Sequence, residues 1–174
     1  MAIRGNHYDA AFEAYLRARK TPYVAVDEQR RALLEDASLK SMDFIVYSRH
    51  PKNLLVDVKG RRYPSGDAEH GHRFENWATA EDIPSLLTWE RVFGEGFRAV
   101  LVFAYHVVSA PALRDFEELF QFRERTYAFF GVWVNDYQTA MQTRSASWQT
   151  VAVPSDSFRE MRFPIARFLT DAPP

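Results

Sequence analysis

An acidic and a basic side chain stand two positions apart in an apolar, strand-like run of this sequence, residues 54–59. Side chains of a strand point to opposite faces in turn, so Asp57 and Lys59 share one face. An earlier apolar run, residues 42–47, carries Asp43. The polar segment between the two runs contains Pro51, which predicts a hairpin. A carboxylate and an ammonium group that project together from such a strand could take part in acid–base or electrostatic chemistry.

The register of this hairpin decides whether the two carboxylates meet. Folding the chain about residue 50 places Asp43 opposite Asp57, with Cβ atoms about 4.5–5.5 Å apart. Carboxylates that close repel each other unless a cation or a proton lies between them, and such an oxygen-rich site suits Mg²⁺ or Mn²⁺. Alternatively, a one-residue slip turns Asp43 to the other face, and Asp57 and Lys59 form a surface ion pair worth about 0–1 kcal/mol. The branched apolar residues around Asp57 favour the metal site.

The same residues resemble a known motif. Asp43, thirteen intervening residues and Asp57-Val58-Lys59, after a helix that carries Glu13, are similar to the PD-(D/E)XK nuclease superfamily. The sequence departs from the pattern at Met42, where the motif has a proline. The resemblance extends over about residues 7–105. It implies a restriction-endonuclease-like fold, an α/β protein in which a three-layer α/β/α sandwich surrounds a central mixed β-sheet.

The first predicted helix carries a second, more specific sequence motif. His7-Tyr8-Asp9-Ala10-Ala11-Phe12-Glu13 resembles the motif of the bacterial HYExAFE family, with Asp9 in place of the first glutamate. This resemblance covers most of the chain and implies a bacterial protein close to that family.

The superfamily resemblance implies a role for each residue. Asp43 and Asp57 would ligate one Mg²⁺ or Mn²⁺ ion near the backbone carbonyl of Val58, and Glu13 would reach the ion directly or through a bound water. Lys59 would orient the attacking water or stabilise charge on the phosphate. These roles agree with the chemistry of phosphodiester hydrolysis, because a metal polarises a phosphoryl oxygen and activates water, and a cation beside the developing charge acts in the transition state.

Two glutamates have competing interpretations. Glu13 stands four residues before Arg17, so the two side chains could instead form a surface pair. Glu90 lies on the apolar stripe of a helix predicted to open at the capping-box-like segment Thr79–Asp82. A carboxylate on a core face needs a partner, so we expect Glu90 to touch Lys59 or a metal-bound water. Alternatively, it reaches solvent.

Basic and aromatic residues cluster after the candidate site. Arg61, Arg62 and Arg73 are candidates for phosphate contacts, and Trp77 could stack on an unpaired base. Alternatively, these residues belong to a solvated loop. Arg144 and Trp148 are weaker candidates for extending the same surface.

The remaining pattern predicts helices interleaved with strands, which is typical of an α/β sandwich. Helices are expected over residues 7–19, 30–35, 79–93 and 136–143, after Pro111 and from Ser155, with a break at Pro164. Strands are expected over residues 23–26, 42–47, 54–59, 97–108, 127–134 and 148–153, and residues 60–78 are expected to form a loop.

Composition narrows the function classes. The 174 residues include 22 Lys+Arg and 23 Asp+Glu, so a nucleic-acid partner would have to bind a local patch or a metal-assisted site. Cysteine is absent, which excludes disulfides, thiolate metal sites and cysteine nucleophiles. The sequence has neither an apolar run of about 18 residues, as a membrane helix requires, nor a signal-peptide core. We expect one cytoplasmic domain over residues 1–174 and no membrane contact.

These observations predict a metal-dependent nuclease whose partner is nucleic acid, with DNA as the expected substrate. The first alternative is a non-catalytic nucleic-acid-binding or protein-interaction module on the same fold. The second is an interaction protein unrelated to nucleases, suggested by the aromatic-rich C-terminal half. Whether the protein forms a homodimer is left open by the sequence.

Overall fold

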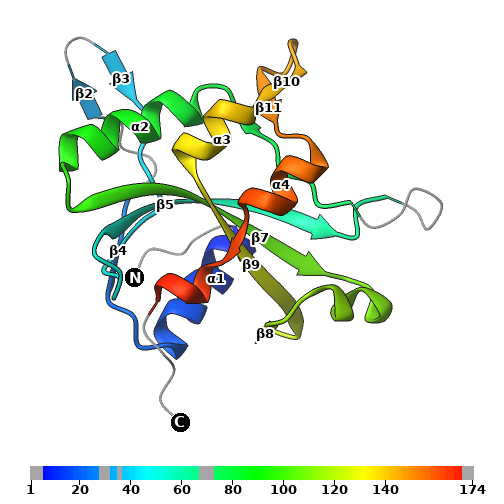
Figure 1. The fold of residues 1–174 in the computed structure, drawn as a ribbon. Coiled ribbons are helices and arrows are strands. Elements are labelled where there is room, and N and C mark those ends of the chain that lie inside the picture. Colours follow the sequence, from blue (N-terminus) through cyan, green and yellow to red (C-terminus); the bar gives the residue numbers. More distant parts are fainter. Residues whose placement is uncertain (1–5, 28–31, 35–36, 67–72, 170–174) are drawn as a thin grey trace.

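The computed structural model describes residues 6–27, 32–34, 37–66 and 73–169. Its centre is a seven-stranded mixed sheet with the order β1-β4-β5-β7-β9-β12 and with β8 paired to β9 (Figure 1). The two long central strands β5 and β7 run parallel, whereas β4 and β9 pair antiparallel on either side. The strands of this sheet are β1 (Tyr23–Ala25), β4 (Phe44–Val46), β5 (Asn53–Tyr63), β7 (Phe97–Val107), β8 (Phe120–Phe122), β9 (Arg125–Trp133) and β12 (Phe163–Pro164).

Helices cover both faces of the sheet, which gives the predicted three layers (Figure 1). The helix α1 (His7–Ala18) packs against β5 and β7 on one face. On the other face lie α2 (Asp82–Phe93), α3 (Val134–Ala140) and α4 (Ser155–Met161).

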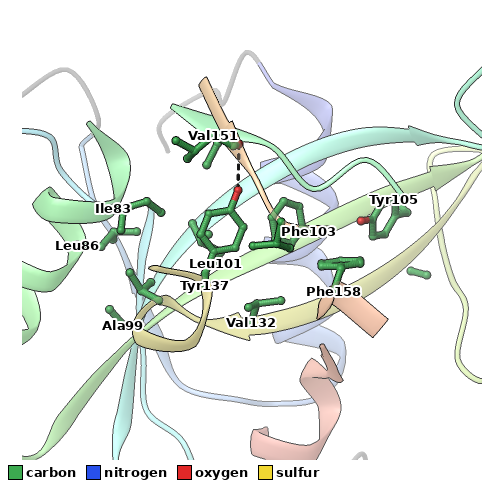
Figure 2. Close-up of a cluster of buried hydrophobic side chains, with 14 of the residues drawn as sticks. Ile83, Leu86, Ala99, Leu101, Phe103, Tyr105, Val132, Tyr137, Val151 and Phe158 are labelled. Carbon is green, nitrogen blue, oxygen red and sulfur yellow. Dashed lines mark hydrogen bonds between the residues drawn. The ribbon is translucent and has the colours of Figure 1, made fainter. Parts of the chain in front are cut away.

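The central strands are apolar on both faces, as expected for strands buried between two helical layers. Alternate residues of β7 enter two separate cores. Leu101 and Phe103 join a cluster with Tyr137 and Phe158 (Figure 2), whereas Val100 and its alternate neighbours pack under α1.

The first helix forms as its sequence predicts. The Asn6 side chain accepts a hydrogen bond from the backbone N–H of Tyr8 at 2.9 Å, which satisfies one of the donors left over at a helix start. An apolar stripe on this helix is buried against the sheet; it is formed by Ala11, Phe12, Tyr15 and Leu16.

The predicted hairpin and its register are confirmed. Phe44 pairs with Val56, Ile45 with Leu55 and Val46 with Leu54. These pairs are those obtained by folding the chain about residue 50, so no slip separates the two acidic positions.

Other predicted boundaries were wrong. Residues 60–63, expected in a loop, continue β5 and pair with β7 as far as Tyr63 and Val107. Gly60 in this stretch lets α1 pack closely on the strand, because a Cβ atom there would stand 2.1 Å from the Tyr8 ring. Of the helix expected at residues 30–35, only 32–34 are described, and they form the strand β2 (Ala32–Leu34), which pairs with β3 (Ala37–Leu39).

Smaller elements complete the structure. A three-stranded sheet has the order β10-β11-β6, formed by β10 (Gln142–Ser145), β11 (Thr150–Ala152) and β6 (Ala78–Thr79). The expected helix after Pro111 is the 3-10 turn η2 (Ala110–Asp115), and η3 (Ile165–Phe168) follows β12. None of the described helices is both long and apolar enough to cross a lipid bilayer.

Candidate active site

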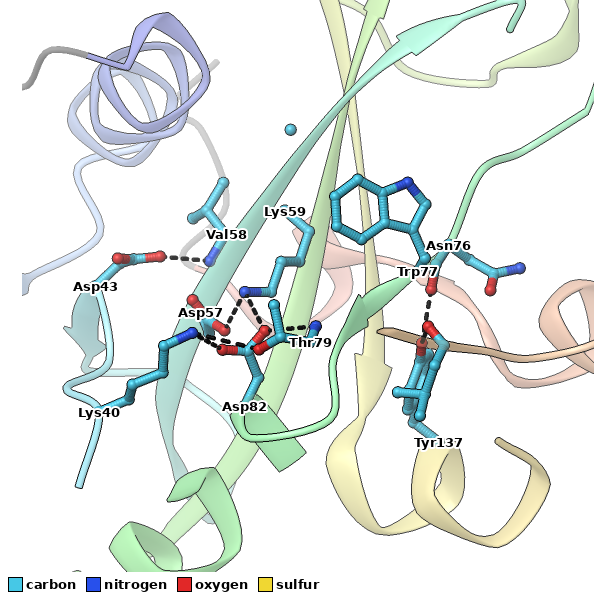
Figure 3. A network of polar contacts seen from close by, with 12 residues as sticks. Lys40, Asp43, Asp57, Val58, Lys59, Asn76, Trp77, Thr79, Asp82 and Tyr137 are labelled. Atoms are coloured by element: carbon cyan, nitrogen blue, oxygen red, sulfur yellow. Dashed lines mark hydrogen bonds and ion pairs between the residues drawn. The ribbon is translucent and has the colours of Figure 1, made fainter. Parts of the chain in front are cut away.

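A polar pocket of about 250 Å³ opens where four elements meet (Figure 3). Its walls come from the start of α1, the segment leading into β4, the middle of β5 and the start of α2. The lining residues are Asn6, Asp9, Lys40, Ser41, Asp43, Asp57, Val58, Lys59 and Asp82. The structure therefore places Asp43, Asp57, Val58 and Lys59, all from one hairpin, around a single pocket.

The Asp43 carboxylate is fixed against the neighbouring strand. Its Oδ2 accepts a hydrogen bond from the backbone N–H of Val58 at 2.6 Å, and its own N–H donates to the Val56 carbonyl at 2.9 Å. Asp43 is almost entirely buried. The side chain thus meets the β5 backbone where the β4–β5 ladder ends, and this contact sets its orientation in the pocket.

Charges of alternating sign line the wall formed by β5 and α2. Lys59 Nζ lies 2.8 Å from an oxygen of Asp57 and 2.8 Å from an oxygen of Asp82. Lys40 Nζ lies 2.7 Å from the other Asp82 oxygen. Asp82 is buried, and the Lys59 and Asp57 side chains are 16% and 13% exposed, so solvent screens these pairs less than it screens fully exposed ones.

The network keeps its members charged. Burial disfavours the ammonium form of Lys59, but the adjacent Asp57 and Asp82 carboxylates outweigh this and raise its pKa above the usual value. Burial likewise opposes ionisation of Asp82, yet Lys59 and the hydrogen bond from Lys40 hold the pKa of that carboxyl well below its usual range. Lys59 is therefore a cation at neutral pH.

Sequence reasoning missed Asp82 and Lys40 as site residues. Asp82 accepts a hydrogen bond from the backbone N–H of Thr79 at 2.9 Å, as the capping-box pattern predicts, although α2 begins at Asp82 with Glu81 as its N-cap and not at Thr79. The same carboxylate faces the pocket from the first turn of α2, where the helix dipole favours a negative charge. The capping-box pattern identified Asp82 as a residue at the start of a helix, but it did not indicate that the side chain also lines the pocket.

The acidic residue that α1 contributes to the pocket is Asp9, which is 3% exposed, and not Glu13. Glu13 Oε1 accepts hydrogen bonds from the Tyr23 hydroxyl at 2.8 Å and from Arg17 at 3.1 Å. The i, i+4 pair that competed with the metal role is thus the observed arrangement. Asp9 and Glu13 share a helix face, but they lie one turn apart, about 6 Å along the axis, and the pocket is at the Asp9 end.

Glu90 also lies away from the pocket. Its carboxylate accepts a hydrogen bond from the Ala99 N–H at 2.7 Å and another from the Asn135 amide at 3.4 Å. Glu90 is eight residues beyond Asp82, about 12 Å along α2. It therefore satisfies a backbone donor near the start of β7 instead of contacting Lys59.

The three arginines predicted to contact phosphate lie in different environments in the structure. Arg61 is only 8% exposed; its guanidinium donates to the carbonyls of Gly60 and Trp77 and lies 3.7 Å from the centroid of the Trp77 ring. Arg62 is exposed, and the exposed Arg73 lines a different hollow beside α4. Arg61 is thus held in place beneath the surface, and Trp77 has a cation against its ring.

The pocket suits a hard divalent cation by donor type. Asp9, Asp43 and Asp57 supply carboxylate oxygens, and Mg²⁺ is usually held by one or two carboxylates together with water and substrate phosphate. Within the described ranges, no three His, Asp or Glu side chains are gathered closely enough to hold a metal. The candidate ligands are the carboxylates that line the pocket, with Asp43 and Asp57 as the pair that the hairpin supplies.

Comparisons with known proteins bear on the fold. No protein-family model and no curated protein matches the chain. Among solved structures, the chain is similar to Hjc, a Holliday junction resolvase from the archaeal hyperthermophile Archaeoglobus fulgidus. The TM-score is 0.54 at 14% sequence identity, and the alignment covers 94% of this chain and 98% of that one. With its central mixed sheet between helical layers, the protein has a restriction-endonuclease-like α/β fold.

Proposed function

We propose that this protein is a divalent-metal-dependent nuclease that hydrolyses phosphodiester bonds of DNA. One observation carries the proposal: Asp43, Asp57 and Lys59 converge on a single polar pocket of a restriction-endonuclease-like fold. The structural neighbour is a Holliday junction resolvase, which supports DNA as the nucleic acid. Membership of the HYExAFE family remains part of this proposal.

The charge balance of the pocket favours cation binding before phosphate binding. Four aspartates, residues 9, 43, 57 and 82, outnumber the two lysines, residues 40 and 59. Such a pocket repels a bare phosphate and attracts a divalent cation. When bound by Asp43 and Asp57, Mg²⁺ or Mn²⁺ would polarise a phosphoryl oxygen and lower the pKa of a water.

Lys59 acts in this proposal as a positive charge and hydrogen-bond donor. Its two carboxylate neighbours keep it protonated, so it does not serve as the base that accepts a proton from water. An ammonium group held beside the phosphate stabilises the negative charge that develops in the transition state. Asp82 is the positioning residue, because its carboxylate forms the second ion pair of Lys59, at 2.8 Å.

The direct test is cleavage of labelled DNA in single-stranded, duplex, flap and four-way forms, with Mg²⁺ or Mn²⁺, beside the variant Asp57→Ala. We expect metal-dependent cleavage of at least one form by the parent protein and its loss in the variant. Cleavage that persists in Asp57→Ala, or no cleavage of any form by the parent, would overturn the proposal.

One observation favours a second candidate, a non-catalytic nucleic-acid-binding module. Lys59 already compensates the charge of Asp57 through an ion pair of 2.8 Å, as it would in a site that never takes up a metal. Thermal melting with Mn²⁺ separates the candidates, because an ion that binds only the native state stabilises it, by about 2.7 kcal/mol at 100 times Kd. A metal site predicts a melting temperature that rises with Mn²⁺ and stays constant in Asp43→Ala, whereas the binding module predicts no rise in either protein.

A further inference from the structure

The hairpin formed by β10 and β11 projects from the body of the protein (Figure 1). At its tip, Trp148 is 79% exposed, more than any other large apolar side chain in the described ranges. The tip backbone is nevertheless held in place, since the Ser145 hydroxyl accepts the Trp148 N–H at 3.2 Å and lies 3.2 Å from the Ser147 hydroxyl. A fixed turn therefore presents an indole ring to solvent.

The hairpin is joined to the wall of the candidate active site at the end nearest its turn. In β11, Thr150 pairs with Thr79, and the next residue in the chain, Ala80, donates its N–H to the Gln149 carbonyl at 2.8 Å. The Thr79 N–H in turn donates to Asp82, which lines the pocket and binds Lys59. The tip is thus linked to the pocket by backbone contacts with Thr79 and Ala80 and by the hydrogen bond from Thr79 to the Asp82 carboxylate.

Cationic and aromatic groups continue from the pocket towards the hairpin. Arg61 lies two positions beyond Lys59 on the same face of β5, and its guanidinium covers the Trp77 ring at 3.7 Å. On the same ring, the Arg144 guanidinium of β10 lies 5.2 Å from the centroid. Arg61 is buried and Trp77 has both guanidinium groups against its ring, so the groups exposed for binding are Arg144 and Trp148.

The charge of the hairpin complements a polyanion. Residues 142–150 contain no Asp or Glu, and their single charged residue is the exposed Arg144. An arginine and an indole ring exposed on one hairpin suit a single nucleic-acid strand, whose phosphates bind arginine and whose bases stack on indole rings. A duplex offers the phosphates but not the faces of its bases, which are already stacked within the helix.

We propose that the β10–β11 hairpin binds an unpaired DNA strand next to the candidate active site, with Trp148 stacking on a base and Arg144 contacting a phosphate. This inference rests on the proposed function for its substrate class. It adds that the substrate has a single-stranded portion at the cleavage site, as an end, a flap or a branch point would supply.

The test is equilibrium binding of a fluorescent oligothymidylate, measured by anisotropy in EDTA so that no cleavage occurs. Base–aromatic stacking predicts that Trp148→Ala weakens binding about 5- to 150-fold, whereas Trp148→Phe, which keeps an aromatic face, retains most of the affinity. Arg144→Ala should weaken binding and lower the salt slope by about one. The matched control is Arg91→Ala, which removes an exposed arginine from α2 and should leave binding at the parental level.

The comparison with duplex DNA of the same length completes the test. We expect Trp148→Ala to change duplex affinity by less than about twofold, because base faces are inaccessible there. Three outcomes would overturn the inference. Trp148→Ala could bind oligothymidylate as tightly as the parent, it could lose as much affinity for duplex DNA as for the single strand, or Trp148→Phe could bind as weakly as Trp148→Ala. Binding is measured without metal, so the two proposals can fail separately. If the protein binds through Trp148 but never cleaves DNA, only the nuclease proposal is refuted. If the protein cleaves DNA but Trp148→Ala does not change single-strand binding, only the hairpin proposal is refuted.

Discussion

At the scale of single residues, replacing Lys59 should lower the rate of DNA cleavage much more than the affinity for DNA. Lys59→Met keeps an apolar stem of similar length and removes the charge that faces Asp57 and Asp82. Cleavage should fall about 10²-fold or more, as when one transition-state donor is lost. DNA affinity, measured in EDTA, should change far less, because the acidic pocket contributes little to phosphate binding when no metal is bound. Cleavage at the parental rate would show that Lys59 has only a structural role.

Asp82 should affect the rate of DNA cleavage by holding Lys59 in position. Asp82→Asn can still accept the Thr79 N–H, so the start of α2 is retained, but the charged contacts with Lys40 and Lys59 are lost. We expect the free energy of unfolding to fall by about 1.5–3 kcal/mol, the usual worth of hydrogen bonds to charged groups. A positioning role also predicts a lower kcat with little change in KM, partly rescued in Asp82→Glu. Loss of stability with unchanged kcat would leave Asp82 a purely structural residue.

At the scale of elements, the site depends on how α1 lies against β5. Asp9 enters the pocket because the first turn of α1 packs where Tyr8 covers Gly60. In Gly60→Ala the new Cβ atom would stand 2.1 Å from the Tyr8 ring, so helix and strand must move apart. Overpacking of this kind costs about 1–3 kcal/mol, measurable by urea unfolding.

The matched control is Gly96→Ala, since a Cβ atom there meets nothing within 4 Å. Gly60→Ala should also weaken the Mn²⁺-dependent rise in melting temperature, because it displaces the carboxylate of Asp9. Equal stability of the two variants would mean that the close contact between α1 and β5 is not needed to place this helix.

At the scale of the whole molecule, the charge network sets the pH range of stability. The pKa of Asp82 is lowered on folding, so the unfolded chain binds more protons and stability falls as the pH drops below about 4. The pKa of Lys59 is raised on folding, so its contribution is complete below the usual lysine value and is lost only as the pH rises above about 10.4. Urea unfolding at a series of pH values should therefore show a plateau between these limits. In Asp82→Asn the acid limb should become shallower, and an unchanged acid limb would mean that other carboxylates dominate acid unfolding.

The sequence by itself determined what depends on local periodicity. The hairpin brings Asp43 and Asp57 to one pocket because strand side chains alternate with a period of two and because the register follows from the short connection between the strands. The start of α1 follows from its Asn6 cap and its apolar stripe. These signals act over a few residues, so they can be read without knowledge of the fold.

Tertiary packing decided which residues from distant elements complete the pocket. Asp9 and Glu13 share a helix face, and only the seating of α1 on β5 selects Asp9. Likewise, the pocket lies at the Asp82 end of α2, whereas Glu90 at the other end satisfies the backbone of β7. The physical reason is that helical periodicity specifies the direction of a side chain around the axis, but its position along the axis relative to the sheet is set by packing between elements far apart in the chain.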